Sequence, residues 1–341
     1  MSTNFKKGVL LVNLGTPDAP TRFAVYRYLK EFLLDRRVID LSWLRRNLLV
    51  RGIIAPFRSG NTAKLYQKLW TEEGSPLKVY GEKLASGVQD LLGDAFEVEL
   101  GMRYQNPSME SAIDNLLSKN VAEIIVLPLY PQYASASTGS VHEEVMRVMS
   151  KKEKIPVIKL INSFYNNEEM IDVFVENAKK YNIDSYDHFL FSFHGLPQRQ
   201  LKKADDCNHC LVAENCCSTI SEKNQFCYSA QCFATAQAIA NKLDLKPTDY
   251  TICFQSRLGR DPWVQPYTSQ TIEERASKGD KKILVFCPAF VSDCLETTIE
   301  VLEEYREEFL EKGGEQLDLV ESLNDHPKWI KAVKNLILSY P

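Results

Sequence analysis

His194 stands where its imidazole could exchange protons with a bound ligand. Residues 189–193 form a short apolar run typical of a buried strand, and Gly195 and Pro197 end that run. In a parallel α/β sheet, ligands bind at the edge formed by the carboxyl ends of the strands. A neutral imidazole at that edge can accept a proton near neutral pH. A hydrogen-bonded structural histidine would fit the same position, so this stretch alone leaves the role of His194 open.

Three glutamates form a second candidate for chemistry. Glu296, Glu300 and Glu304 are spaced by four residues, which predicts that they share one face of a helix. Like charges at this spacing destabilise a helix by about 0.2–0.5 kcal/mol per pair, and a solvated acidic face is one interpretation of the run. Glu296, however, follows an expected strand and lies among apolar residues. A carboxylate row that begins there could carry protons or bind a hydrated divalent cation.

A cluster of thiols is the third candidate, because five of the nine cysteines lie within residues 207–227. Structural disulfides are rare in a reducing compartment, so this density favours a metal site. Thiolates of this kind bind zinc or an iron–sulfur cluster, and four of the five would suffice as ligands. Free thiols remain the other alternative. The candidate ligands are Cys207, Cys210, Cys216, Cys217 and Cys227.

Composition narrows the class of protein. The chain has 341 residues, which suggests two domains, and a formal net charge of −4, which gives no indication of a nucleic-acid partner. There is no G-x-G-x-x-G after the first expected strand and no G-x-x-x-x-G-K-[ST], so nucleotide folds are disfavoured. No apolar stretch approaches the ~20 residues of a membrane span, and the N-terminal apolar run is too short for a signal sequence. A cytoplasmic protein is expected.

Apolar runs alternate with amphipathic segments along the chain, which predicts parallel sheets with right-handed crossovers. Strands are expected at 8–14, 96–101, 121–127, 155–161, 188–193, 250–254, 283–287 and 317–320. Helices are expected at 21–34, 109–118, 170–181, 229–243, 295–312 and 327–339. This pattern predicts an α/β fold with two doubly wound, Rossmann-like domains, residues 1–165 and 166–325, followed by a C-terminal helix in 326–341. The special residues at the strand ends are expected to meet in a cleft between the domains.

Residues 36–60 mix large apolar side chains with arginines. They could be a plain pair of core helices or an apolar, basic lip over the site. With no membrane span expected, this lip is the only region suited to peripheral contact with a membrane.

Seven segments carry a family resemblance, and they follow one another in the family's order over nearly the whole chain. They are LVNLGTP (11–17), GMRYQNP (101–107), LPLYPQY with STGS (127–140), SFHGLP (192–197), FQSRLGRDPW (254–263), CPAFVSDCLETTIE (287–300) and ESLND (321–325). The sequence thereby resembles the ferrochelatases, lyases that insert Fe²⁺ into a porphyrin in the last step of protoheme synthesis. The resemblance implies the chelatase fold, with protoporphyrin and ferrous iron as substrates and two pyrrole protons released.

The resemblance also implies roles for particular residues. His194 would face the pyrrole nitrogens, Glu296 would lie on the path of the substrate iron, and Glu300 would continue the catalytic row. Arg36 would meet a propionate of the porphyrin, with Ser59 as a weaker candidate for the same contact; a surface cation is the alternative for Arg36. The remaining substrate-binding candidates are Leu14, on the opposite face of the macrocycle, and Tyr104, Tyr130 and Trp263, as ring-contacting or network residues.

Two features depart from the family's pattern. Cys294 stands where many relatives have a histidine beside Asp293, and it could be a thiolate or a small buried side chain. The second is the insertion at residues 207–227. Some ferrochelatases carry a [2Fe–2S] cluster with ligands from a C-terminal tail and the loop after YPQY, but this chain has Ser135 in that loop and ends at Pro341 without a tail cysteine. The resemblance therefore implies a cluster held within the insertion, with zinc as the alternative.

Other functions stay open at this point. GRDPW and the long lip favour protoporphyrin over coproporphyrin, which is the closest alternative substrate. A cobalt chelatase of the same fold typically needs two facing histidines, whereas the site offers His194 alone. A porphyrin-binding iron–sulfur protein without catalysis would have no use for the acidic row. The sequence gives no indication of the oligomeric state.

Overall fold

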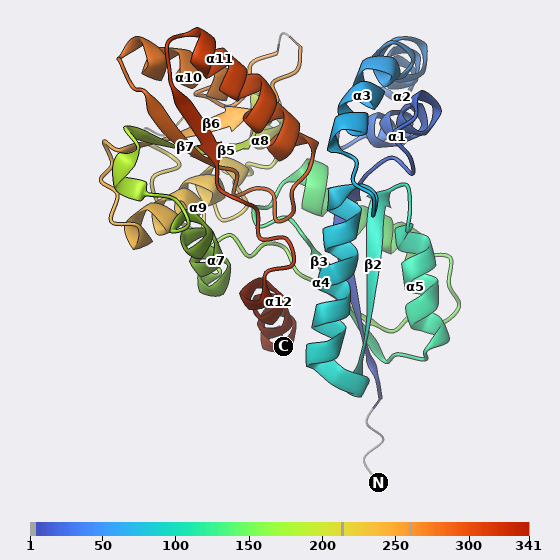
Figure 1. The fold of residues 1–341 in the computed structure, drawn as a ribbon. Helices are drawn as coiled ribbons and strands as arrows, with labels where there is room; N and C mark the ends of the chain where they lie inside the picture. Colours follow the sequence, from blue (N-terminus) through green and yellow to red (C-terminus); the bar gives the residue numbers. More distant parts are fainter. Residues whose placement is uncertain (1–4, 213–214, 260, 341) are drawn as a thin grey trace. The chain divides into compact units, whose positions relative to one another are not determined.

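The computed structural model describes residues 5–212, 215–259 and 261–340. The chain forms two compact units (Figure 1). Unit 1 comprises Met1–Tyr130, Ser135–Ser163 and Asp325–Pro341, and unit 2 comprises Pro131–Ala134 and Phe164–Asn324. The C-terminal helix, which the sequence analysis set apart, thus belongs to unit 1.

Unit 1 is built on a parallel four-stranded sheet in the order β2-β1-β3-β4. The strands are β1 (Lys7–Gly15), β2 (Phe96–Tyr104), β3 (Glu123–Pro128) and β4 (Val157–Leu160). The central strand β1 is apolar and buried along most of its length, because helices cover both faces of a parallel sheet. Its Leu10 and Val12 pack with α5 (Met109–Ser118) and α6 (Ser140–Met149) in one core cluster.

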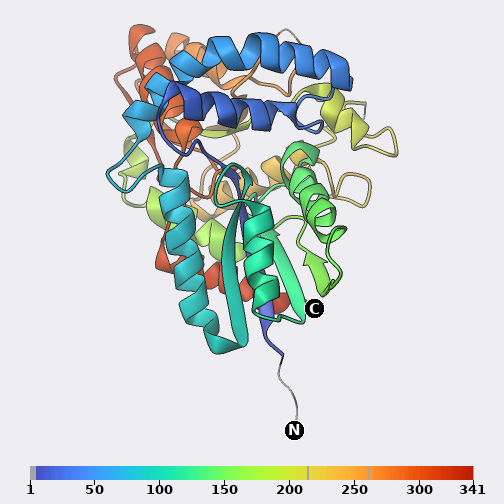
Figure 2. The ribbon, with the colours of Figure 1, turned by 90° about the vertical axis from the view of Figure 1, so that its right-hand side faces the viewer.

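The remaining helices of unit 1 fall into two groups. The helices α1 (Arg22–Leu34), α2 (Trp43–Leu49) and α3 (Ala55–Leu69), with the π-helix η1 (Val50–Ile54), gather at the carboxyl end of β1 and β2 (Figures 1 and 2). The others are α4 (Pro76–Leu92) and α12 (Pro327–Ser339). The sequence analysis missed α4, although Pro76 in its first turn and Gly93 at its end, with φ +67°, are typical helix boundaries.

Unit 2 repeats this plan with the strand order β6-β5-β7-β8, again all parallel. Its strands are β5 (His188–His194), β6 (Tyr250–Gln255), β7 (Lys282–Phe286) and β8 (Gln316–Leu319). Its helices are α7 (Glu168–Ala178), α8 (Gln198–Lys203), α9 (Tyr228–Lys242), α10 (Thr268–Ser277) and α11 (Arg306–Glu311). The predicted α/β class with two parallel sheets is confirmed.

Two local predictions were wrong. The strand predicted for 96–101 continues to Tyr104, because Tyr104 still pairs with Gly15 of β1. The helix predicted for 295–312 begins as the π-helix η5 (Leu295–Tyr305) and becomes α-helical only at Arg306. Wider turns of this kind are rare and often occur at functional sites. Within the described residues, no helix is long and apolar enough to cross a membrane.

Candidate active site

His194 is the last residue of β5, where it pairs in register with Gln255 of β6. Its Nδ1 atom lies 2.7 Å from the carbonyl oxygen of Gly195. A carbonyl oxygen only accepts hydrogen bonds, so Nδ1 is the donor, and in the neutral tautomer Nε2 is the nitrogen that can accept a proton. The rings of Trp263 and Phe290 lie 6.5 and 6.3 Å from the imidazole, measured between ring centroids. The structure therefore directs Nδ1 to the backbone and leaves Nε2 as the ring nitrogen available to a ligand, close to aromatic side chains.

Glycine is required beside this histidine. The backbone N–H of Gly195 donates to the carbonyl oxygen of Gln255 at 2.8 Å. A Cβ atom at position 195 would lie 2.8 Å from that oxygen and 3.0 Å from Cε3 of Trp263, which is closer than side chains normally approach. The absence of a side chain at Gly195 thus lets the end of β5, the end of β6 and Trp263 come together.

Glu300 is held by donors on both of its oxygens. The backbone N–H of Ser256 and the hydroxyl of Tyr305 donate to Oε1, each at 2.8 Å. The hydroxyl of Ser256 and the side-chain amide of Gln255 donate to Oε2, at 2.6 and 3.0 Å. Ser256 has φ +64°, a conformation that is uncommon outside glycine and that points its N–H and Oγ to the same carboxylate. Glu300 is therefore an anchored anion.

Glu296 and Glu304 lie in different surroundings. Glu296 is half-buried in the first turn of η5, and its backbone carbonyl accepts a hydrogen bond from the same Gln255 amide at 2.8 Å. Glu304 is exposed near the end of η5. The row of glutamates thus runs from a half-buried start to a solvated end.

Cys294 is a buried thiol that caps η5. Its sulfur accepts the backbone N–H of Thr297, and the Thr297 hydroxyl accepts the backbone N–H of Cys294 at 3.0 Å. Burial and the nearby carboxylate of Glu296 raise the pKa of Cys294 well above its usual range. Of the two alternatives for this position, the structure favours the neutral buried thiol over the thiolate.

Unit 1 contains a buried polar network around Asp35, the residue that caps the C-terminus of α1. Its Oδ2 atom accepts hydrogen bonds from Arg103 at 2.8 Å, the Tyr104 hydroxyl at 2.9 Å and the Ser140 hydroxyl at 2.5 Å. Burial, together with the charge of Asp35, raises the pKa of Tyr104, which keeps its hydroxyl protonated as a donor. Asp35 and Ser140 were not identified from the sequence as site residues.

The predicted propionate ligands differ in exposure. Arg36 is exposed and forms an ion pair with Glu143, whose Oε1 lies 2.9 Å from the guanidinium. Arg37 pairs with the same Glu143 and donates to Ser135 Oγ at 2.8 Å. Ser59 is buried, and its hydroxyl donates within α3 to the Pro56 carbonyl at 3.2 Å.

The remaining unit 1 candidates lie at the carboxyl edge of its sheet. Leu14 is half-buried near the end of β1, and Tyr130 follows β3. Within the described residues the Tyr130 hydroxyl is buried and has no hydrogen-bond partner, and burial raises its pKa. Next to Leu14, Gly15 has φ +112°, and a Cβ there would overlap the Tyr104 carbonyl oxygen. The close approach of β1 and β2 at this pair therefore also requires glycine.

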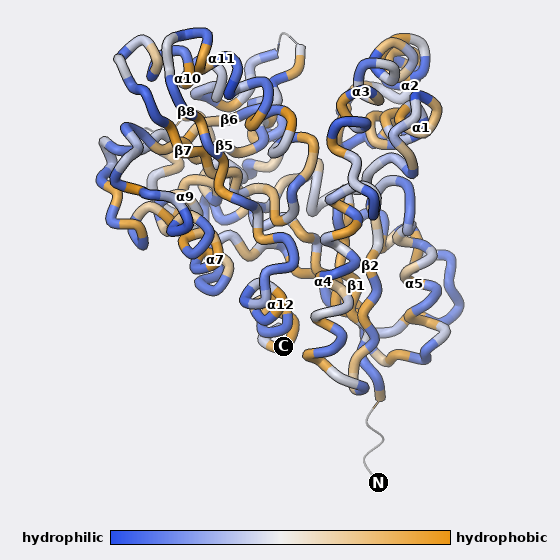
Figure 3. Tube along the Cα trace, viewed as in Figure 1, coloured by the Kyte–Doolittle hydropathy of each residue, from blue (hydrophilic) through white to orange (hydrophobic). Residues whose placement is uncertain are grey.

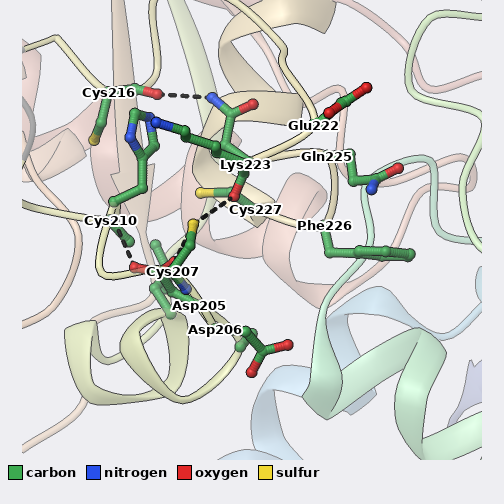
Figure 4. Close-up of a pocket in the computed structure, with 14 residues that line it drawn as sticks. Asp205, Asp206, Cys207, Cys210, Cys216, Glu222, Lys223, Gln225, Phe226 and Cys227 are labelled. Atoms are coloured by element: carbon green, nitrogen blue, oxygen red, sulfur yellow. Dashed lines mark hydrogen bonds between the residues drawn. The ribbon is translucent and has the colours of Figure 1, made fainter.

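Four cysteines of the insertion border a cavity of about 340 Å³ (Figure 4). Cys207, Cys210, Cys216 and Cys227 line it. Cys217 is not among the lining residues, and its thiol donates to Ser229 Oγ at 3.2 Å. The hydrogen bond from the thiol of Cys210 lowers the pKa of Cys227 well below its usual range. In the parts of the chain that the structure describes, no group of three or more potential ligands is close enough to hold a metal ion.

Polar side chains organise the insertion backbone. Asn224 is buried, and its amide donates to the carbonyl oxygens of Cys216 and Thr219, each at 2.8 Å, and accepts from the Ser221 N–H at 2.6 Å. Asp205 accepts the backbone N–H of Cys210 at 2.7 Å. These two residues were missed in the sequence analysis. They give the loop a hydrogen-bonded frame that does not depend on a metal.

Comparisons with known proteins agree with this architecture and these motifs. The ferrochelatase family model matches residues 6–340. A ferrochelatase of Legionella pneumophila (strain Lens) is 44% identical over 332 residues, 97% of this chain and 98% of that protein. One of Coxiella burnetii (strain Dugway 5J108-111) is 45% identical over 340 residues, 98% of this chain and 94% of that protein. The cobalt complex of the sirohydrochlorin chelatase SirB from Bacillus subtilis subspecies spizizenii shares the fold, with a TM-score of 0.55, 11% identity and coverage of 98% and 95%.

The family match over residues 6–340 defines the class of this protein as a metal chelatase. The chain belongs to the ferrochelatase family. Its reaction is the insertion of iron into protoporphyrin in heme biosynthesis, and the enzyme is a lyase. The predicted family and activity are confirmed.

Proposed function

We propose that His194 accepts the pyrrole protons of protoporphyrin during iron insertion. Two N–H protons leave the macrocycle for each Fe²⁺ that enters, so the reaction needs an acceptor that can be emptied and reused. The observation that carries this role is the hydrogen bond between Nδ1 and the Gly195 carbonyl, because it leaves Nε2 as the acceptor. Replacing His194 is the direct test: iron insertion is lost while porphyrin binding remains.

Glu296 and Glu300 have separate roles in this proposal. Both oxygens of Glu300 already accept hydrogen bonds, so Glu300 serves as an anchored anion that favours positive charge nearby. Glu296 lies at the half-buried start of η5, and it relays protons or guides the ferrous ion as the ion sheds its waters.

Glutamine at position 296 is expected to reduce kcat for iron insertion by roughly 10- to 100-fold, because the side chain keeps its size but no longer carries a proton or attracts a cation. The matched control is Glu304→Gln, in which an exposed carboxylate of the same helix is changed, and its kcat stays within about twofold of wild type. Anaerobic initial rates with Fe²⁺ and protoporphyrin measure both. Equal rates in the two variants would mean that the row is only a solvated acidic face.

Arg36 is the proposed contact for a porphyrin propionate. Arg36 is exposed and pairs with Glu143. It can exchange Glu143 for a propionate without leaving a buried charge unpaired, because Arg37 also pairs with Glu143. Ser59 keeps its hydroxyl inside α3, so we assign the propionate to Arg36 alone. Leu14, Tyr104, Tyr130 and Trp263 are the proposed contacts for the ring or its supporting network.

An Arg36→Ala variant is expected to raise KM for protoporphyrin about tenfold, which corresponds to one lost charge-assisted hydrogen bond, with little change in kcat. Arg147→Ala is the control, since Arg147 is also an exposed arginine of unit 1 that pairs with glutamates. Its KM stays at the wild-type value. An unchanged KM in Arg36→Ala would identify Arg36 as a surface cation.

The lip, residues 36–60, is the proposed surface for peripheral membrane contact. Hydrophobic stretches are visible in α2 and α3 (Figure 3). Exposed arginines at positions 45, 51 and 58 accompany these side chains and suit an anionic lipid surface. The exposed apolar side chains in the lip are Leu41, Trp43, Leu44, Leu48, Ile53 and Phe57.

We further propose that the insertion holds a [2Fe–2S] cluster. The cavity of about 340 Å³ is bordered by thiols from both ends of the insertion, which is the donor set that such a cluster requires. Cys207, Cys210, Cys216 and Cys227, which line the cavity, are the proposed ligands, and Cys217, whose sulfur lies 3.8 Å from that of Cys216, is the alternative to Cys216. A bound cluster supplies a one-electron redox centre, and its thiolate ligands tie the two ends of the insertion together. Zinc is the alternative occupant.

A further inference from the structure

The peptide group that joins His194 to Gly195 is held from both sides. Its carbonyl oxygen, that of His194, accepts a hydrogen bond from the hydroxyl of Tyr228 at 2.8 Å. Its N–H, that of Gly195, donates to the carbonyl oxygen of Gln255 at 2.8 Å. The next carbonyl oxygen, that of Gly195, accepts from Nδ1 of His194. The direction of the imidazole is therefore coupled to the orientation of this peptide group.

Of these contacts, the one from Tyr228 comes from a helix and not from the sheet. Tyr228 is the first residue of α9 and is buried. The helix that carries it is itself anchored to neighbouring loops of unit 2: Gln231 accepts the N–H of Tyr133 at 2.7 Å, and Thr235 donates to the carbonyl of Tyr165 at 2.8 Å. The hydroxyl of Tyr228 thus reaches the end of β5 from a rigid support.

We propose that Tyr228 is a positioning residue for iron insertion: by holding the carbonyl oxygen of His194, it sets the direction in which the Nε2 atom of His194 faces. This inference rests on the proposed role of His194 as proton acceptor. Gly195 has the backbone freedom of a residue without Cβ, so the peptide before it needs external contacts to keep one orientation. A small error in the direction of a catalytic group is enough to lower the rate, because proton transfer depends on alignment.

The position of Tyr228 in the chain links His194 to the insertion. It directly follows Cys227, the last cysteine of the insertion. The backbone of Cys227 is also tied to the insertion, since its N–H donates to the Asn224 carbonyl at 2.8 Å. Tyr228 therefore connects the end of the insertion to the backbone of His194.

The test is the Tyr228→Phe variant, which removes one oxygen atom. Its kcat is expected to fall about tenfold, the effect of one hydrogen bond, while KM for protoporphyrin and for Fe²⁺ stays within about twofold. Tyr181→Phe is the matched control, because Tyr181 also donates to a backbone carbonyl of unit 2, that of Leu319 at 2.7 Å, at the end of β8. Its kcat is expected to stay at the wild-type value.

Two further readouts separate positioning from general support of the fold. In a His194→Ala background, Tyr228→Phe should cause no additional loss of the residual activity, because it acts through His194. In ¹⁵N spectra of histidine-labelled protein, the His194 resonances, assigned by their absence in His194→Ala, should show one Nδ1–H tautomer in wild type and Tyr181→Phe. A mixture of tautomers is expected in Tyr228→Phe.

Each result decides between the proposals. If His194→Ala remains active, the proposed role of His194 fails. If His194→Ala is inactive but Tyr228→Phe matches wild type in kcat and tautomer, the role of Tyr228 fails alone. A raised KM with unchanged kcat, or an equal loss in both backgrounds, also overturns the positioning role. The spectroscopic comparison tests positioning even where a variant is too unstable for kinetics at assay temperature.

Discussion

His194→Ala is expected to fold, to bind protoporphyrin and to lose iron insertion by roughly 10²- to 10⁴-fold, the usual effect of removing a general base. The structure gives the reason. Nδ1 of His194 is held by the Gly195 carbonyl, which leaves Nε2 to accept a proton, whereas both oxygens of Glu300 are already occupied by donors. Without the imidazole, the pyrrole protons would pass to water or to a poorly placed carboxylate.

Initial rates and porphyrin binding, followed by the change in porphyrin fluorescence, measure the two expectations separately. His326→Ala serves as the control, because His326 caps α12 by accepting the Lys328 N–H and is expected to affect stability by about 1 kcal/mol but not turnover. Turnover of His194→Ala within threefold of wild type would exclude the proposed role.

The second large effect is expected at the insertion. Wild-type protein prepared without oxygen should be red-brown and contain about two irons and two sulfides per chain. Cys227→Ser should lose the iron and the colour, because serine cannot replace a thiolate of the cavity and Cys227 ties the insertion to α9. Cys217→Ser, a change in the same loop but outside the cavity lining, should keep both.

Metal and sulfide analysis of the three proteins gives the answer. One zinc per chain with no iron and no visible absorption would show that the insertion is held by zinc. Loss of iron in Cys217→Ser with retention in a Cys216→Ser variant would exchange the roles of these two neighbours. Metal-free wild-type protein with an ordered insertion would mean that the frame around Asn224 and Asp205 is sufficient.

Much of the fold follows from local pattern, and so does the position of His194. A short apolar run that ends in glycine and proline is enough to predict a buried strand and its exposed end, and the structure places β5 there. The end of β2 was harder to predict. Arg103 and Tyr104 are polar enough to resemble a loop, but they continue the strand because Tyr104 pairs with Gly15.

The partners of Glu300 show what the local pattern could not reveal. A helical period of 3.6 residues puts Glu296, Glu300 and Glu304 in one row and turns Tyr305 away from it. In η5 the turns are wider, so that Tyr305, five residues after Glu300, donates to its carboxylate. Ser256, which directly follows β6, donates to the same carboxylate because its backbone has a positive φ, and the neighbouring residues do not predict that conformation.

Other site residues depend on contacts between segments far apart in the chain. Asp35 gathers Arg103, Tyr104 and Ser140 across a separation of up to 105 residues. Such pairs need the sheet to be formed before they become neighbours, so the sequence motifs named Tyr104 but not its acceptor. The contact between Tyr228 and His194 is of the same kind, because the insertion separates them in the chain.

The most direct test of the account is anaerobic iron insertion by the purified wild-type chain, followed by optical spectroscopy and by proton release in a weakly buffered solution. The account predicts that protoporphyrin is converted to heme, with two protons released for each iron inserted and with a rate that depends on His194. Porphyrin that binds, shifts its spectrum and remains free of metal in the presence of Fe²⁺ would contradict it.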